Sequence, residues 1–145
     1  VPCVVSGRGA ASRGRLAQLV ANDKIKTAGV MTSDACLVYA TFPSTDSAEA
    51  VGRALVASKL AACVNILPAM TSLYEWQGTL HREAEVVMLI KTVTDRAADV
   101  VASVRQSHPY DNPAILVLPI MGGSMDFLRW ISAQTSETPS HAGEA

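Results

Sequence analysis

The chain contains little cysteine, and its cysteines are not spaced for a joint role. Cys3, Cys36 and Cys63 are the three cysteines among 145 residues, and no CxxC pair occurs. An odd number without that spacing argues against a disulfide framework and against a structural zinc site. A reducing compartment is the simplest prediction.

The chain also lacks an excess of charge of one sign and a long hydrophobic run. Its net charge is −1, which is not the basic balance typical of nucleic-acid binding. No apolar run approaches the roughly 20 residues of a membrane-spanning helix. Apolar residues still make up 49% of the chain, so it can bury the core of one globular domain.

The two ends differ in composition from the middle of the chain. Residues 1–22 contain three arginines and no acidic residue, separated by Ser, Gly and Ala. This composition resembles part of an organelle transit peptide, although a plain extension would fit equally. We therefore expect an N-terminal extension over residues 1–35, a domain over residues 36–134 and a polar, disordered tail over residues 135–145. If the extension is a transit peptide, the chloroplast is the expected location, and otherwise the cytoplasm.

Periodicity and turn residues predict three helices and four strands within the domain. The predicted strands cover residues 36–42, 62–76, 79–92 and 115–120, and the predicted helices cover residues 47–61, 94–107 and 124–134. Asp46 and Glu49 have capping-box spacing at the start of the first helix. Ser124 can cap the last helix, and Phe127, Leu128 and Ile131 form its expected apolar face. Pro68 cannot donate a ladder hydrogen bond, so it predicts a bulge or an edge position.

The two middle strands form an unusually long hairpin around Gln77-Gly78. An arm of about 14 residues would be about 45 Å long, whereas a domain of about 100 residues is only about 35 Å across. The second arm has Val86, Met88 and Ile90 on one face and Val87 and Leu89 on the other. Both faces therefore need cover near the centre of this strand.

The order strand, helix, strand, strand, helix, strand is that of a ferredoxin-like sandwich, here with an additional C-terminal helix. Right-handed crossovers place the first two helices on one face of a four-stranded antiparallel sheet and leave the other face bare. Self-association would cover this apolar face and pair the projecting strands. We therefore expect an α+β fold that forms an oligomer.

Several sequence blocks resemble the CutA family of divalent-cation tolerance proteins. The blocks are KLAACVN, SLYEW, IKT and HPY, within SKLAACVNILPAMTSLYEWQG, EVVMLIKT and HPYDNPAILVLPI, and they keep the family's order and spacing. The resemblance extends from about Leu37 to Ala133. It implies a homotrimer, similar in architecture to the PII signalling proteins, with sheets inside, helices outside and strands paired between subunits.

The resemblance also implies a role in divalent metal tolerance, with copper as the expected ion. Bacterial members are credited with copper binding through a first-strand cysteine and two adjacent histidines. Ala40 and Ser107 stand at the positions of that cysteine and the first histidine, and His108 matches the second. His108 and Cys63 are therefore the candidate copper ligands. A helix-terminal histidine bonded to backbone and a small buried cysteine are the alternative interpretations.

A set of aromatic and charged residues forms the second candidate site. Its members are Tyr74, Trp76, Glu85, Lys91, Tyr110 and Trp130. The predicted topology can bring several of them to one cleft between subunits, where apolar walls with a few polar groups are typical of a small-ligand site. An aromatic seam that holds the trimer together is the alternative. A PII-like scaffold that binds a small ligand or a protein partner at these clefts, without obligatory metal, is the alternative function.

No arrangement typical of catalysis is evident, so we expect a protein that is not an enzyme. GxSxG, HExxH and a phosphate-binding glycine loop are all missing from the sequence. Acylphosphatases share the ferredoxin-like plan, but they need a glycine-rich anion loop with an arginine and a supporting asparagine. Arg53 and Asn65 lack that context.

Overall fold

The structure is a computed structural model, and it describes residues 33–136. Along the chain its elements are β1 (Ala35–Phe42), α2 (Thr45–Ala57), β2 (Cys63–Trp76), β3 (Thr79–Val93), α3 (Thr94–Ser107), β4 (Ile115–Pro119) and α4 (Met125–Thr135). The strands form one antiparallel sheet in the order β2-β3-β1-β4. This order and the positions of the helices confirm the ferredoxin-like prediction.

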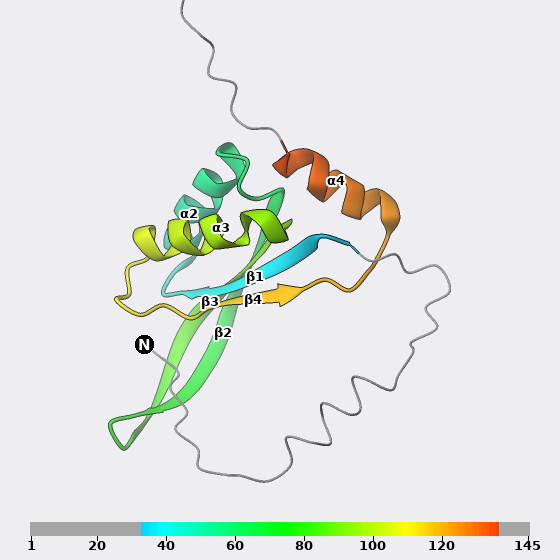
Figure 1. Cartoon of the computed structure of the whole chain (residues 1–145). Helices are drawn as coiled ribbons and strands as arrows, with labels where there is room; N and C mark the ends of the chain where they lie inside the picture. Colours follow the sequence, from blue (N-terminus) through cyan, green and yellow to red (C-terminus); the bar gives the residue numbers. More distant parts are fainter. Residues whose placement is uncertain (1–32, 137–145) are drawn as a thin grey trace, which may run out of the picture.

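Helices α2 and α3 cover one face of the sheet, and the ends of β2 and β3 project beyond it (Figure 1). The core between these layers contains Val38, Phe42, Leu55, Met88 and Ile90, each fully buried. Side chains alternate between the two faces of a strand, so the neighbours of these strand residues point away from the helices. The buried helix positions in α2 and α3 are Ala48, Val51, Gly52, Leu55, Ala97, Val100 and Val104.

The other face of the sheet is largely uncovered. Its central side chains, including Tyr39, Val87 and Leu89, are half-buried. Towards the two edges, Leu67, Leu116 and Leu118 have exposed fractions of 48%, 59% and 44%. This surface, which we call the open face, is the bare apolar face that the topology predicts.

Helix α2 begins earlier than predicted, and its cap is different. Ser44 is the N-cap, and its hydroxyl accepts a hydrogen bond from the backbone N–H of Ser47 at 3.2 Å. The predicted box between Asp46 and Glu49 does not form, because Asp46 is inside the first turn and is not the N-cap. The Glu49 carboxylate pairs instead with Arg53 one turn later, at 3.1 Å. The helix therefore starts at Thr45, two residues before the predicted start.

The hairpin contains the predicted bulge and a two-residue turn. Leu67 pairs with Val87 and Met70 with Glu85, so Pro68 and Ala69 stand opposite a single residue of β3. Ala69 has a φ of 65°, in the left-handed region. Gln77 and Gly78 have φ values of 51° and 76°, as the tight connection of a hairpin requires. Strand β2 is at the sheet edge, where a proline is tolerated.

The described elements extend slightly beyond the predicted domain at both ends. Asp34 and Ala35 belong to the fold, since Asp34 O accepts a hydrogen bond from the backbone N–H of Thr94 at 2.7 Å and Ala35 starts β1. At the other end, α4 includes Thr135, which is buried. The remainder of the expected extension and tail lies outside the described residues. Within residues 33–136, no helix is long and apolar enough to cross a membrane.

Helix α4 packs at the end of the sheet with part of its predicted apolar face. Leu128 and Ile131 are buried against Ala35 and Ala62. Phe127 was expected on the same face, but it is 45% exposed and stacks on Trp130, with ring centroids 5.5 Å apart. Ser124 is the N-cap residue, but its side chain makes no capping hydrogen bond.

Candidate functional site

His108 lies at the point where α3 ends and is held by two backbone groups. Its Nε2 is 2.6 Å from Thr41 O, and its Nδ1 accepts a hydrogen bond from the backbone N–H of Tyr110 at 3.0 Å. Because a carbonyl can only accept, Nε2 must donate to Thr41 and carries the ring proton. The ring also packs against Phe42, with centroids 4.5 Å apart.

This arrangement favours the structural interpretation of His108. A metal ligand must offer a lone pair, but the lone pair on Nδ1 is used by Tyr110 and Nε2 bears the proton. Burial lowers the pKa of His108, although the hydrogen bond to Thr41 opposes this effect. The ring is therefore neutral and fully hydrogen-bonded.

Cys63, the second candidate copper ligand, is far from His108 within one chain. Cys63 pairs with Lys91, which in turn pairs with Leu37 near the start of β1. His108 contacts Thr41 near the other end of β1. Four residues of strand correspond to about 13 Å, so one ion cannot bind both side chains of the same chain. Within one chain, His108 and Cys63 therefore cannot share a copper ion, and each stays a separate candidate ligand.

No other metal centre takes the place of this pair in the described part of the chain. Among residues 33–136, no group of three or more His, Cys, Asp or Glu side chains is placed to hold a metal ion. Cys36 is buried on the helix-covered face, and burial raises its thiol pKa, which disfavours the thiolate. Cys36 and Cys63 are both free.

The predicted aromatic site is partly assembled within one chain. An open hollow of about 520 Å³ lies between the projecting hairpin and the loop that follows α3. Its lining residues are Tyr74, Trp76, His81, Pro109, Tyr110, Asp111 and Asn112. We call it the aromatic hollow. Three of the six predicted residues, Tyr74, Trp76 and Tyr110, contribute to it.

The register of the hairpin positions two of the rings. Tyr74 and His81 are cross-strand partners, and their rings stack with centroids 5.2 Å apart and an interplanar angle of 11°. Tyr110 reaches the hollow from the loop, where its ring lies 5.1 Å from that of His108. The hydrogen bonds of His108 therefore anchor the loop that carries Tyr110.

Carboxylates give the region beside the hollow a negative character. Glu85 Oε2 accepts a hydrogen bond from Ser72 Oγ at 2.5 Å. Burial and the nearby carboxylates of Glu83 and Glu85 raise the pKa of Tyr74, and burial with the same two carboxylates raises that of Tyr110. Glu85 thus lies close to the hollow, although it is not among the lining residues.

The other two predicted members lie elsewhere in the chain. Lys91 Nζ donates a hydrogen bond to Asn65 Oδ1 on the neighbouring strand. Trp130 is on α4 and stacks on Phe127. Their residue types suggested a cleft, but the topology separates them from the aromatic hollow within one chain.

Sequence reasoning missed His81 and Asp111 as parts of the hollow. His81 could have been found by counting outward from Gln77-Gly78, because a two-residue turn sets Tyr74 opposite His81. Asp111 follows Tyr110 directly in the sequence, but no sequence pattern places that loop beside the hairpin.

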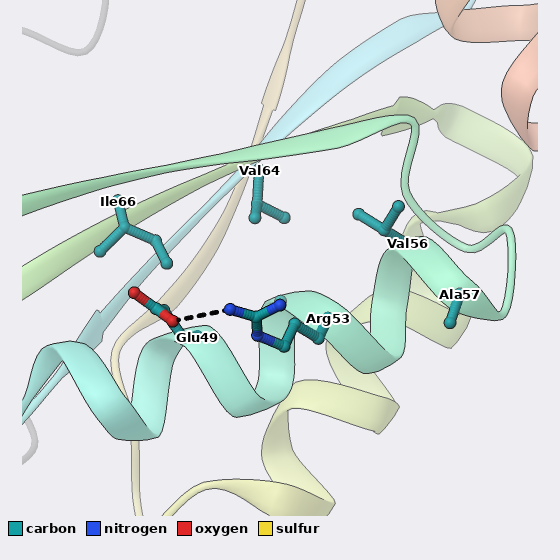
Figure 2. A pocket seen from close by; sticks show the side chains of 7 residues that line it. Glu49, Arg53, Val56, Ala57, Val64 and Ile66 are labelled. Carbon is teal, nitrogen blue, oxygen red and sulfur yellow. Dashed lines mark hydrogen bonds and ion pairs between the residues drawn. The ribbon is translucent and has the colours of Figure 1, made fainter.

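A second hollow lies between α2 and the edge strand β2 (Figure 2). Its volume is about 520 Å³, and Val56, Val64 and Ile66 give it an apolar lining. The two charged residues that line it, Glu49 and Arg53, pair with each other, as Figure 2 shows. This hollow therefore offers no unpaired charge to a ligand.

Comparison with known proteins defines the family. The family model described as "CutA1 divalent ion tolerance protein" matches residues 36–134. A divalent-cation tolerance protein CutA from Pectobacterium atrosepticum is 42% identical over 100 residues, which are 69% of this chain and 91% of the relative. A CutA protein from Yersinia pestis is 42% identical over 104 residues, which are 72% of this chain and 87% of the relative.

Solved structures agree with the sequence relatives. CutA1 from Thermus thermophilus is 40% identical with a TM-score of 0.68, covering 70% of this chain and 98% of its own. CutA1 from Oryza sativa is 35% identical with a TM-score of 0.69, covering 72% of this chain and 95% of its own. The class of molecule is therefore the ferredoxin-like CutA fold. The chain belongs to the CutA1 family of divalent ion tolerance proteins, as the sequence blocks predicted.

Proposed function

We propose that this protein acts in tolerance of divalent cations. The observation that carries the proposal is the family match over residues 36–134, together with relatives named for this role that are 42% identical. Loss of the protein should lower growth in excess divalent metal, and the chain should restore it. Equal growth of the deletion strain and the parent strain across a series of metal concentrations would contradict the proposal.

We further propose that the working form is a homotrimer. The open face exposes Leu67, Leu116 and Leu118, and β2 and β4 are sheet edges with unpaired backbone groups. Packing three open faces together would bury these leucines and pair the edges. Sedimentation equilibrium of the purified protein should give three times the mass of one chain. A well-folded monomer at micromolar concentration would overturn this assembly.

Copper remains the proposed ion, but a shared site would need more than one subunit. His108 and Cys63 are separated within the chain, and both ring nitrogens of His108 are already engaged. Calorimetric titration with Cu(II), and with Cu(I) under reducing conditions, should be compared among the wild type, Cys63→Ser and His108→Gln. Equal affinity in all three proteins would remove these residues as ligands.

A second candidate function is recognition of a small ligand in the aromatic hollow, without catalysis. Its volume of about 520 Å³ is within the usual range of about 300–1,000 Å³ for small-molecule sites. A bound ligand stabilises the folded state by mass action. Thermal-shift measurements against a panel of metabolites should therefore yield at least one stabilising compound whose effect is lost in Tyr110→Leu.

The location of the protein is proposed from sequence alone. The arginine-rich start of the chain supports import into an organelle, with the chloroplast expected. A fusion of residues 1–35 to a fluorescent reporter should enter that organelle. A reporter that stays in the cytoplasm would contradict import and favour the cytoplasm as the location.

A further inference from the structure

Within one chain, the aromatic hollow combines electron-rich rings with negative charge and has neither lysine nor arginine in its lining. Tyr74 and His81 are on the open face, so in the proposed trimer a neighbouring subunit would border the hollow. Tyr74 and Trp76 line it from β2, and Tyr110 lines it from the loop after α3. Asp111 contributes a carboxylate to the lining. An aromatic ring has a negative face, so the rings and the carboxylate both attract a positively charged ligand.

The surroundings strengthen this negative character. Glu83 and Glu85 lie on the same face of β3 as His81, because residues two apart in a strand share a face. Their carboxylates raise the pKa values of Tyr74 and Tyr110 in addition to the effect of burial. Arg82 alternates to the opposite face, and Lys91 is six residues beyond Glu85, or about 20 Å along the strand.

We propose that the aromatic hollow binds a small organic cation of the substituted-ammonium class. The rings of Tyr74, Trp76 and Tyr110 contribute cation–π attraction, and Asp111 contributes Coulomb attraction. The inference rests on the second proposed function, since it names the ligand class for that site. It does not depend on the role in metal tolerance.

The side chains around the hollow suit a substituted ammonium ion better than an inorganic metal ion. A divalent metal needs several directed oxygen, nitrogen or sulfur ligands at short distance. The described residues place no group of three such side chains together, here or elsewhere. A substituted ammonium ion instead spreads its charge over methyl or methylene groups and is attracted to ring faces without directed lone pairs. A neutral ligand would gain the apolar contact but not the attraction to the carboxylates.

The test compares two ligands of nearly equal shape that differ in charge. Choline carries a trimethylammonium group, and 3,3-dimethylbutan-1-ol carries a tert-butyl group in its place. Each is titrated into the full-length protein at about pH 8, where an ordinary histidine is neutral, and at low salt, where exposed charges are least screened. Binding is followed by calorimetry. We expect choline to bind about tenfold more tightly than the neutral alcohol.

Variants locate the site. Trp76→Leu keeps an apolar side chain but removes the ring, and we expect it to lower choline affinity about fivefold. Asp111→Asn should lower choline affinity and leave that of the alcohol unchanged. Phe127→Leu is the control, because Phe127 is an aromatic residue that is 45% exposed and was never a candidate for this site, while Trp76 is 38% exposed. The control should bind choline as the wild type does, and melting curves check that every variant is folded.

Each remaining outcome decides against part of the proposal. Equal binding of choline and the alcohol would overturn the cation class but keep a ligand-binding hollow. Equal loss of choline binding in Trp76→Leu and Phe127→Leu would overturn the location. If neither compound binds at millimolar concentration but the metabolite panel gives a Tyr110-dependent ligand, the class is wrong and the second function stands. If nothing binds, both the cation class and the second proposed function are wrong.

Co-sedimentation of the protein with phosphatidylcholine vesicles, without binding of free choline, would show that the site takes a lipid headgroup. That result would overturn the proposal of a free small-molecule ligand.

Discussion

At the scale of single residues, His108 shows how an apparent metal ligand becomes part of the framework. Its ring joins the end of α3 to Thr41 of β1 and to the loop at Tyr110. Protonation of Nδ1 would place a second N–H against the N–H of Tyr110 and break that bond. The folded protein therefore prefers the neutral ring, in agreement with the lowering of the His108 pKa by burial.

This preference predicts a loss of stability in mild acid. The His108 pKa is lowered in the folded state and is about 6.5 in the unfolded state, so below about pH 6.5 the unfolded chain binds a proton that the folded chain does not. The free energy of unfolding should therefore fall as the pH decreases from about 6.5 and level off below the folded pKa. Urea unfolding at fixed protein concentration, at about pH 7.5 and about pH 5.5, measures the effect.

His81 is the matched control for this prediction. It is half-buried beside Tyr74, whereas His108 is buried and bonded through both nitrogens. His108→Gln should lower stability at about pH 7.5 by about 1–3 kcal/mol and remove most of the fall in acid. His81→Gln should show the same decrease in the free energy of unfolding in acid as the wild type. An unchanged acid dependence in His108→Gln would show that other groups cause it.

At the scale of elements, Gly52 sets how closely α2 approaches the edge strand. A Cβ built at Gly52 would be 2.9 Å from Val64 Cγ2 and 3.3 Å from Met88 Sδ. Gly52→Ala gains up to about 1 kcal/mol of helix propensity, but overpacking typically costs about 1–3 kcal/mol. We expect the variant to be net destabilised, as measured by denaturant unfolding.

A double-mutant cycle separates these two effects. In a Val64→Ala background the contact at 2.9 Å is removed, so Gly52→Ala should become neutral or stabilising. Ala50→Gly, on the exposed side of the same helix, measures the effect of helix propensity on stability without a change in packing. The packing argument is wrong if Gly52→Ala has the same effect with valine and with alanine at position 64.

The bulge in β2 offers a substitution that should stabilise the fold. Ala69 has a φ of 65°, and a residue with a Cβ loses about 1–2 kcal/mol in this conformation. Ala69→Gly removes that strain but increases the entropy of the unfolded chain, so we expect a gain of about 0.5 kcal/mol. Ala84→Gly, in a regular part of β3, should destabilise the protein. Equal losses in the two variants would contradict the strain at the bulge.

The elements were predictable because each depends on local pattern. Alternation in residues 86–90 gave the correct faces of β3. Pro68 indicated the bulge because a proline cannot complete the ladder. The start of α2 was less predictable, since Ser44, Thr45 and Asp46 are all good caps and the preference among them depends on side-chain orientation.

The candidate sites were less predictable because they depend on contacts between distant segments. His108 and Thr41 are 67 residues apart, and no sequence pattern reports that their atoms are in hydrogen-bond contact. Trp130 was grouped with Tyr74 on residue type, but its position follows from the packing of α4 at the sheet end. The hairpin register, in contrast, was fixed by a short turn and so could place Tyr74 beside His81.

At the scale of the whole molecule, the open face is the surface through which we propose that the chains associate. The sheet is one layer thick, and its helix-free side exposes leucines at both edges. At roughly 25 cal/mol per Å², the burial of several such side chains in an assembly would contribute substantially to its stability. The same packing would support the projecting hairpin, which has little cover within one chain.

A single charge on this face should therefore dissociate the proposed trimer. Leu118 is 44% exposed on β4, and Leu118→Glu would place a carboxylate in the packed interface, where burial of an unpaired charge is costly. Val56→Glu is the control, because Val56 is 38% exposed but lies on α2, on the helical side of the sheet. Sedimentation equilibrium should give one chain mass for Leu118→Glu and three for Val56→Glu and the wild type. If Leu118→Glu remains trimeric with unchanged melting, the open face is not the interface.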